Sequence, residues 1–172
     1  VLIGGGGAAG LNSVQIARRL GCRRLVIPVV GAALSAAGAL MSDLRADFHR
    51  ACLVHTGRFD RAAVNAVLRV LRQQCEEFAA AADADRGAIS IHFTAEARYA
   101  SQVWEIEAPV HCNAFESDSG VARFVEDFHC AHADLFTFAD RASAIEIVGW
   151  TAHVACRLNE TVSMSLSDTD AR

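Results

Sequence analysis

The sequence predicts a short α/β unit followed by a small α+β domain, in which helices cover one face of an antiparallel sheet. The first observation is the order strand, glycine turn, helix, strand within residues 1–28. The second is the order helix, two strands, helix, strand within residues 60–156, where apolar residues change between helical and alternating spacing. A strand, helix, strand order favours a parallel pair, whereas strands with short connections pair antiparallel. We place the boundary between the two parts at residue 48, which gives domains 1–48 and 49–172.

The individual elements follow from the spacing of apolar residues and from the residues that cap or break helices. Helices are expected at residues 12–20, 32–44, 60–82 and 117–135, and strands at residues 1–3, 25–27, 89–99, 103–108 and 145–156. Asn12 or Ser13 is expected to cap the first helix, and Gly21 to follow its end. Residues 43–57 carry mixed charge and two histidines, and are expected to be a transition between the domains.

The glycine turn is the most informative stretch. An apolar run at residues 1–3 leads into four consecutive glycines at residues 4–7. A turn of this kind lets the backbone approach a ligand closely, because no Cβ intervenes. The helix that follows directs backbone N–H groups at an anion or a nucleotide. A tight structural turn packed against its own sheet is the alternative.

Composition limits the classes of function. The 172 residues are 52% hydrophobic and 21% charged, which is typical of a folded globular protein. The net charge of −4 argues against a nucleic-acid partner. All sixteen basic residues are arginine, so the chain supplies no lysine to a phosphate loop or a Schiff base. The apolar residues 25–41 are interrupted by Pro28 and Gly31, which favours a buried strand and helix over a membrane span.

Six cysteines are widely spaced and form no C-x-x-C pair, which argues against a zinc site or a redox pair. We expect reduced, mostly buried thiols in a cytoplasmic protein. The sequence starts within a strand-like run rather than with methionine, and a lone strand needs neighbours for its backbone groups. We therefore expect this chain to be the C-terminal piece of a larger protein.

Gly5, Gly7 and Gly10 match the G-x-G-x-x-G fingerprint of dinucleotide-binding folds, and they lie between a strand and a helix. The acidic residue that would hold the ribose is absent, because no Asp or Glu occurs between Gly10 and Asp43. A variant specific for NADP, with an arginine at 23 or 24, remains open.

Histidines and cysteines near the second half of the chain form no convincing site. Glu126 and His129 have E-x-x-H spacing, with Cys130 and His132 beside them. A di-metal bundle would need this motif twice, so we expect solvated helix residues. We assign no catalytic residue and no metal ligand in this chain.

Several segments resemble the ATP-dependent hydantoinase A / 5-oxoprolinase family, which includes subunits of acetone and acetophenone carboxylases. The resemblance in the first domain rests on residues 6–12 (GGAAGLN), 26–28 (VIP) and 34–36 (LSA). In the second domain it rests on Arg98, Tyr99, Gln102, Phe128, His129, His132 and residues 145–148. The chain departs from the family motif at Ala9, Gly10 and Asn12, where the family often has glycine, proline and histidine.

The resemblance implies that residues 1–48 end an ATP-binding domain similar to that of sugar kinases and actin. It implies ATP and Mg²⁺ as cofactors, and phosphorylation of a cyclic amide such as a hydantoin or 5-oxoproline before the ring opens. Gly5, Gly6, Gly7, Ala8 and Asn12 would contact the nucleotide. The phosphate-binding and metal-binding residues would lie outside this chain, so the fragment alone would be inactive. A second enzyme subunit or a homo-oligomer is the expected partner.

Three other functions remain open from the sequence. The parent protein could be a ketone carboxylase subunit of the same family. Residues 49–172 could be a non-catalytic module that assembles subunits, with a purely structural glycine turn. The first residues could belong to a dinucleotide-binding domain of the NADP type.

Overall fold

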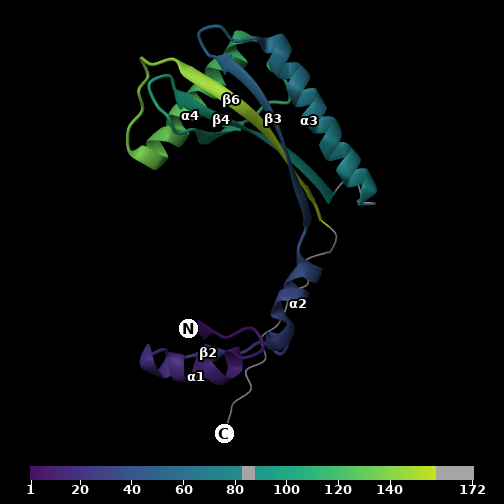
Figure 1. Cartoon of the computed structure of the whole chain (residues 1–172), viewed down its shortest axis with the longest axis vertical. Helices are drawn as coiled ribbons and strands as arrows, with labels where there is room; N and C mark the ends of the chain where they lie inside the picture. The colour runs from purple at the N-terminus through teal and green to yellow at the C-terminus, as the bar shows by residue number, and fades with distance from the viewer. Residues whose placement is uncertain (83–87, 158–172) are drawn as a thin grey trace. The chain divides into compact units, whose positions relative to one another are not determined.

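The computed structural model describes residues 1–82 and 88–157 (Figure 1). The described chain divides into two compact units: unit 1 comprises residues 1–43, and unit 2 begins at Leu44. Residues 158–172, which the predicted second domain includes, lie outside the described residues.

Unit 1 contains a parallel pair of very short strands and three helical segments. These elements are β1 (Leu2–Ile3), α1 (Ala9–Arg19), β2 (Leu25–Val26), the 3-10 helix η1 (Gly31–Ala33) and α2 (Leu34–Met41). The order strand, turn, helix, strand is therefore as predicted. Gly21 follows the end of α1 with a φ of +64°, which is the left-handed conformation that favours glycine at this position.

The expected start and cap of the first helix are wrong. α1 begins at Ala9, and its N-cap is Ala8, which makes no side-chain hydrogen bond. Asn12 and Ser13 lie inside the helix instead. Alanine is the best helix former, so Ala8 and Ala9 allow the helix to begin directly at the glycine turn.

Unit 2 is a four-stranded antiparallel sheet with two helices packed on it, which confirms the predicted α+β class. Its elements are β3 (Leu44–His55), α3 (Arg61–Ala81), β4 (Ile89–Tyr99), β5 (Ile106–Val110), α4 (Asp118–Phe136) and β6 (Ile145–Cys156). The strand order is β3-β6-β4-β5, and all three pairings are antiparallel. α3 contacts β3 and β6, while α4 contacts β5.

Strand β3 occupies the segment that the sequence predicts as a transition, so that expectation is wrong. Among the described residues, β3 lies at the edge of the sheet and pairs with β6 alone. Ala46 and Phe48 are partly buried against the core, whereas Asp47 and His49, which alternate with them, are exposed. Charged residues on an edge strand protect the open edge of the sheet from pairing with another chain. Here they obscure the alternation of apolar residues by which a strand is predicted.

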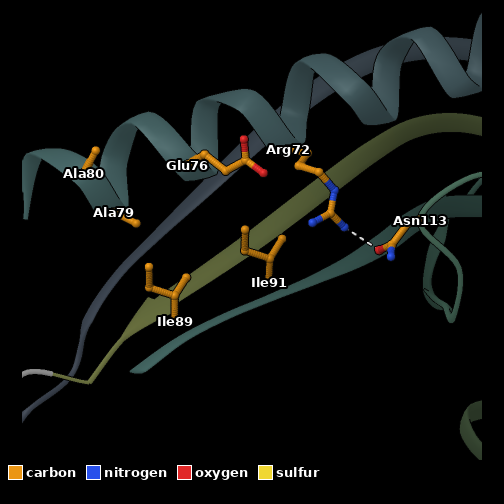
Figure 2. Close-up of a pocket in the computed structure, with 7 residues that line it drawn as sticks. All are labelled: Arg72, Glu76, Ala79, Ala80, Ile89, Ile91 and Asn113. Atoms are coloured by element: carbon orange, nitrogen blue, oxygen red, sulfur yellow. Dashed lines mark hydrogen bonds between the residues drawn. The ribbon is translucent and has the colours of Figure 1, made fainter. Parts of the chain in front are cut away.

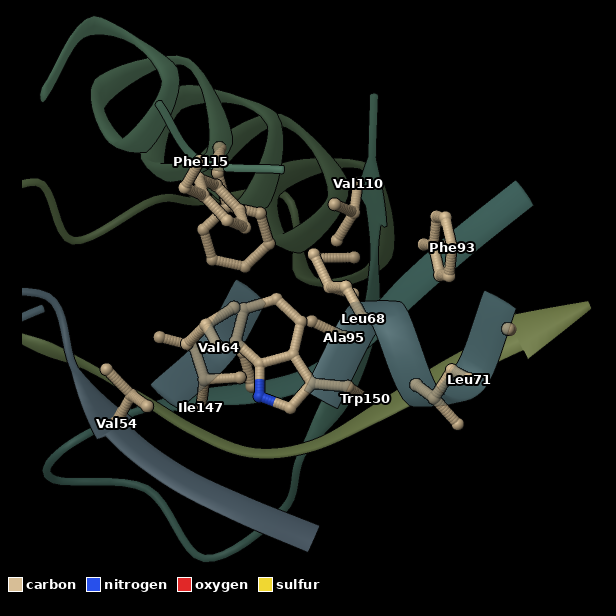
Figure 3. Packing of buried hydrophobic residues seen from close by; sticks show 14 of the residues in the cluster. Val54, Val64, Leu68, Leu71, Phe93, Ala95, Val110, Phe115, Ile147 and Trp150 are labelled. Carbon is tan, nitrogen blue, oxygen red and sulfur yellow. The ribbon is translucent and has the colours of Figure 1, made fainter. Parts of the chain in front are cut away.

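The core of unit 2 lies between the sheet and both helices. Trp150 of β6 is completely buried, and Figure 3 shows its ring among Val64 and Leu68 of α3 and Phe115 of the segment before α4. The Phe115 and Trp150 ring centroids are 5.9 Å apart at a steep angle. Side chains cap the starts of both helices: Asp60 Oδ1 accepts from Ala63 N at 3.0 Å at α3, and Ser117 Oγ accepts from Gly120 N at 3.4 Å at α4.

The expectation of mostly buried cysteines is only partly right. All six are free thiols, and of these Cys75 and Cys156 are buried. Burial raises the pKa of Cys75 to about 11, so this thiol is kept protonated and unreactive. The described part of the chain contains no helix that is both long and apolar enough to cross a membrane.

Candidate functional site

The glycine turn lies at the carboxyl ends of the two parallel strands of unit 1. Gly4 N donates to Val26 O at 2.9 Å, which extends the pairing of β1 and β2 by one residue. Gly6 N donates to Gly31 O at 2.6 Å, so the turn after β1 is bonded to the turn after β2. The carboxyl ends of parallel strands are where open α/β sheets bind ligands. This edge is therefore the candidate site of unit 1.

One glycine of the turn, Gly6, is needed for its shape. Gly6 has a φ of +99°, a backbone conformation that side chains rarely adopt. A Cβ on Gly5 would overlap the end of the Leu34 side chain, so α2 packs closely on the turn. By contrast, a Cβ on Gly7 would meet nothing within 4 Å, and Gly7 faces open space.

The electrostatics of the turn favour an anion. The first backbone N–H groups of a helix have no partner within the helix, and α1 has no side-chain cap and no acidic residue in its first turn. Residues 1–42 contain four arginines and no Asp or Glu. The arginines lie at the far end of α1 and before β2, so the preference of the turn for an anion rests on the positive end of the helix dipole. The site can thus bind an anionic or nucleotide ligand through backbone groups.

The predicted nucleotide contacts lie together in this structure. Gly5, Gly6, Gly7 and Ala8 are exposed along the turn. Asn12 is exposed in the first turn of α1, where its N–H approaches Ala8 O at 3.4 Å. Their contact with a nucleotide stays a prediction.

The Mg²⁺ implied by the resemblance finds no ligand set here: within residues 1–82 and 88–157, no group of three or more His, Cys, Asp or Glu side chains could hold a metal ion. The described chain also does not continue as a doubly wound dinucleotide-binding fold. α2 is followed by β3, which pairs antiparallel with β6.

The histidines of α4 form a buried network, so their expected solvation is wrong. His129 is 4% exposed and His132 is fully buried. Tyr99 Oη lies 2.7 Å from His129 Nδ1, and the amide of Gln102 lies 3.1 Å from His132 Nε2. The residues that carry the family resemblance in β4 and α4 therefore contact one another. The feature of the sequence that could have indicated this network is the pair of histidines three residues apart, beside the buried Phe128.

Two backbone groups complete the network. Asp140 N donates to Tyr99 Oη at 2.9 Å, and His132 Nδ1 lies 2.9 Å from Phe138 O. Burial lowers the pKa of His129 and raises that of Tyr99. Both groups are therefore held neutral, which fits a structural role. Glu126, which has E-x-x-H spacing with His129, bonds to Arg141, with a distance of 2.6 Å from Nη2 to Oε1.

The face of the sheet opposite the helices carries a second polar cluster, which sequence reasoning did not identify. His153 of β6 lies between two carboxylates: Nδ1 is 2.8 Å from Asp47 Oδ1, and Nε2 is 3.1 Å from Glu107 Oε1. Thr94 Oγ1 is 2.9 Å from the same Nε2, and the His92 ring stacks on His153 at 4.7 Å. These contacts connect all four strands laterally.

A groove of about 710 Å³ lies on the helix side of unit 2, between α3 and β4 (Figure 2). Ile89 and Ile91 point into it from β4, and Arg72 and Glu76 from α3. The guanidinium of Arg72 is hydrogen-bonded to Asn113 and lies 5.3 Å from the centre of the Phe93 ring. Since its arginine is already paired, we assign no ligand to this groove.

Comparison with known proteins gives the same relationship as the sequence motifs of β4, α4 and the glycine turn. The chain is 29% identical over 160 residues to caprolactamase subunit alpha of Pseudomonas jessenii. The resemblance to the hydantoinase A / 5-oxoprolinase family is confirmed. The match covers 91% of this chain and 23% of caprolactamase subunit alpha, so the chain spans about a quarter of that relative. No family model matches the sequence.

Solved structures give the same result for the fold. The crystal structure of the ATP-dependent caprolactamase from Pseudomonas jessenii matches with a TM-score of 0.68 and 28% identity, covering 99% of this chain and 26% of that one. A nucleotide-free structure of acetone carboxylase matches with a TM-score of 0.67 and 12% identity, covering 90% of this chain and 23% of that one. The acetone carboxylase likeness concerns the fold alone.

Proposed function

We propose that this chain is the C-terminal portion of an ATP-dependent enzyme that activates a cyclic amide, of the hydantoin or 5-oxoproline kind, for ring opening. Residues 1–48 would end the ATP-binding domain, of the sugar-kinase and actin type, and residues 49–172 would form a C-terminal α+β domain. The observation that carries this proposal is the exposed glycine turn at the carboxyl ends of β1 and β2. It is supported by the 28% sequence identity to an enzyme described as an ATP-dependent caprolactamase.

Within this enzyme, the glycine turn would bind the adenosine part of ATP. Open space above Gly7 admits a flat ring or a ribose, and the free N–H groups of α1 would donate to its polar edge. The chain has no lysine to place on the phosphates, and the part described has no cluster for Mg²⁺. Other parts of the parent protein would supply both, so this fragment alone would not turn over substrate.

A cyclic amide is favoured over a ketone as the substrate. The relative with 29% identity is named for caprolactam, which is a cyclic amide, whereas acetone carboxylase shares 12% identity. Ketone carboxylation stays the second candidate, because the motifs of the chain resemble a family that includes ketone carboxylase subunits.

Substrate-dependent ATP hydrolysis by the full-length parent protein tests this proposal. Lactams, hydantoins and 5-oxoproline would be compared with acetone plus bicarbonate. We expect ATP hydrolysis to rise with at least one cyclic amide, with one ring-opened product formed per ATP consumed. A rise with acetone and bicarbonate alone would support the second candidate instead. No rise with any compound of the panel would contradict both.

We further propose that the parent enzyme works in the cytoplasm with a second subunit. The relative is named as a subunit alpha, which motivates a second kind of chain.

A further inference from the structure

We propose that the groove between α3 and β4 is the docking site of residues 158–172 of the same chain, which we call the final segment, and that part of this segment adds a strand to the sheet beside residues 89–92. The final segment lies outside the described residues, whereas the place that would receive it is described. Two features of unit 2 meet there, an open backbone edge of β4 and a partly apolar groove. The docking of this segment does not depend on the nucleotide site of unit 1.

Residues 89–92 of β4 form an open edge of the sheet. β6 pairs with β4 along its whole length, from Ile89 to Tyr99. β5 pairs with β4 over a shorter stretch, from Phe93 to Ala97. Within residues 1–82 and 88–157, no strand therefore pairs with residues 89–92 on the side of β4 that faces β5.

The backbone groups of Ile89 and Ile91 point to this open side. Arg157 N donates to Ala88 O at 2.9 Å, so Ala88 directs its backbone carbonyl toward the β6 side of β4. In an antiparallel ladder this direction alternates from one residue to the next, so Ile89 and Ile91 direct their N–H and C=O groups away from β6. These groups can pair with a further strand, as in proteins that bind an extended segment at a sheet edge.

The open edge lacks the residues that usually protect an edge from pairing. β3, at one edge of the sheet, carries Asp47 and Arg50, and β5, at the other, carries Glu107 and Pro109. Residues 89–92 read ISIH and contain no proline, carboxylate or arginine. An edge without such residues is normally covered by a further part of the protein.

The groove of about 710 Å³ adjoins the open edge on the helix side of the sheet (Figure 2). Ile89 and Ile91 point into it, and both are only partly buried against the core. Ala79 and Ala80 of α3 also line the groove, and their small side chains leave space beside the isoleucines. A strand at the open edge places every second side chain on this side of the sheet, so these side chains would fill the groove.

The sequence of the final segment has the pattern that this place requires. Val162, Met164 and Leu166 alternate with serines at positions 163, 165 and 167. Such alternation is typical of a half-buried strand. The apolar residues would cover the groove, and the serines would extend the polar face of the sheet that carries His153 and its carboxylate partners.

The final segment also begins close enough to reach the open edge. Arg157 is bonded to Ala88 on the β6 side of β4, and the opposite side of β4 lies two strand spacings away, which is about 10 Å. Residues 158–161 span about 13 Å when extended, so a strand can begin at Val162. Covalent attachment gives the final segment a high effective concentration at this edge, which favours it over a separate chain.

Hydrogen–deuterium exchange of the full-length parent protein tests the pairing. Mass spectrometry with electron-transfer fragmentation measures the exchange of single backbone amides. Met164→Asp places a charge on the apolar side of the proposed strand, and the matched control Ser165→Asp places the same charge on its outer side. We expect the amides of Ile89 and Ile91 to exchange at least tenfold faster in Met164→Asp than in the wild type and in Ser165→Asp.

The amides of Ser90 and His92 are the internal control for an intact sheet. They point to β6 and should exchange equally in all three proteins. Equal exchange of Ile89 and Ile91 in the wild type and in Met164→Asp would overturn the inference. Protection that grows with protein concentration would overturn it as well, because a second copy of the chain would then supply the strand.

Photocrosslinking in the same full-length protein gives an independent measurement. The photoreactive amino acid p-benzoylphenylalanine would replace Glu76, which lines the groove, or the neighbouring Glu77, which is exposed outside the groove lining. We expect irradiation to join position 76, and not position 77, to residues 158–172 of the same chain. A mixture of isotope-labelled and unlabelled protein separates links within one chain from links between chains. A link from position 76 to another chain, to a different part of the same chain, or to nothing would contradict the docking of the final segment.

Discussion

Tyr99 Oη of β4 lies 2.7 Å from His129 Nδ1 of α4, and both side chains are buried. The same oxygen accepts the N–H of Asp140, so one hydroxyl connects a strand, a helix and the loop that leads into β6. A phenol oxygen that accepts this N–H has its own proton free to donate to His129. The neutral ring of His129 is therefore the acceptor that the network needs.

Replacement of Tyr99 by Phe should destabilise unit 2 by about 1–3 kcal/mol, because two buried groups lose their partner. Urea denaturation measures the free energy of unfolding. In a double-mutant cycle, Tyr99→Phe and His129→Leu should cost less together than the sum of the single changes, because they remove the same bond. Strict additivity would show that the two side chains do not interact.

The stability of unit 2 should fall as the pH drops below about 6.5, the ordinary pKa of histidine. Burial, followed by the charge of Arg141, lowers the pKa of His129 in the folded state. The unfolded state thus binds a proton at a higher pH than the folded state, so the contribution of His129 to stability is complete above this pH and declines below it. Urea denaturation between pH 7.5 and 5 measures the slope.

The variant that tests this pH effect is His129→Gln, which should reduce the slope because it removes the titrating ring. An equal pH dependence of the free energy of unfolding in the wild type and in His129→Gln would show that His129 is not responsible for the effect.

The two tryptophans should differ sharply in their contribution to folding. Trp150 is completely buried, and its Nε1 donates to Cys52 O at 3.2 Å, where β3 shifts its register between Ala51 and Val54. Trp150→Phe should cost about 2–4 kcal/mol, because it leaves a cavity and an unpaired carbonyl. Trp104→Phe, at an 81% exposed position, should change stability by less than about 0.5 kcal/mol. Urea denaturation measures both changes in the free energy of unfolding. Similar changes at the two positions would contradict the placement of Trp150 in the core and of Trp104 at the surface.

Much of unit 2 could be predicted from the sequence because its elements have strong periodicity. The alternation over residues 89–99 gives the bounds of β4 as the structure has them, and residues 145–156 give those of β6. Asp60 and Ser117 stand where the expected helices of residues 60–82 and 117–135 start, and their oxygens accept the N–H groups that a helix start leaves free.

Two of the errors share a physical cause, which is that polar residues are ambiguous without their neighbours. Charges on the outer face of β3 conceal an edge strand, and the spacing of the α4 histidines alone predicts solvated residues, whereas Tyr99 and Gln102 bond to them. In the candidate site, the order strand, turn, helix, strand was predicted. The hydrogen bond from Gly6 N to Gly31 O could not be predicted, because it depends on a tertiary contact.

Calorimetric titration of the full-length parent protein with Mg-ATP tests the central claim most directly. A side chain at Gly7 meets no protein atom and should enter the space of the nucleotide, whereas Gly38 on α2 is equally open and serves as the matched control. We expect wild-type and Gly38→Val protein to bind Mg-ATP, and Gly7→Val to bind at least tenfold more weakly. Binding of NADPH instead of ATP, no nucleotide binding, or an unchanged affinity in Gly7→Val would contradict a nucleotide site at the glycine turn.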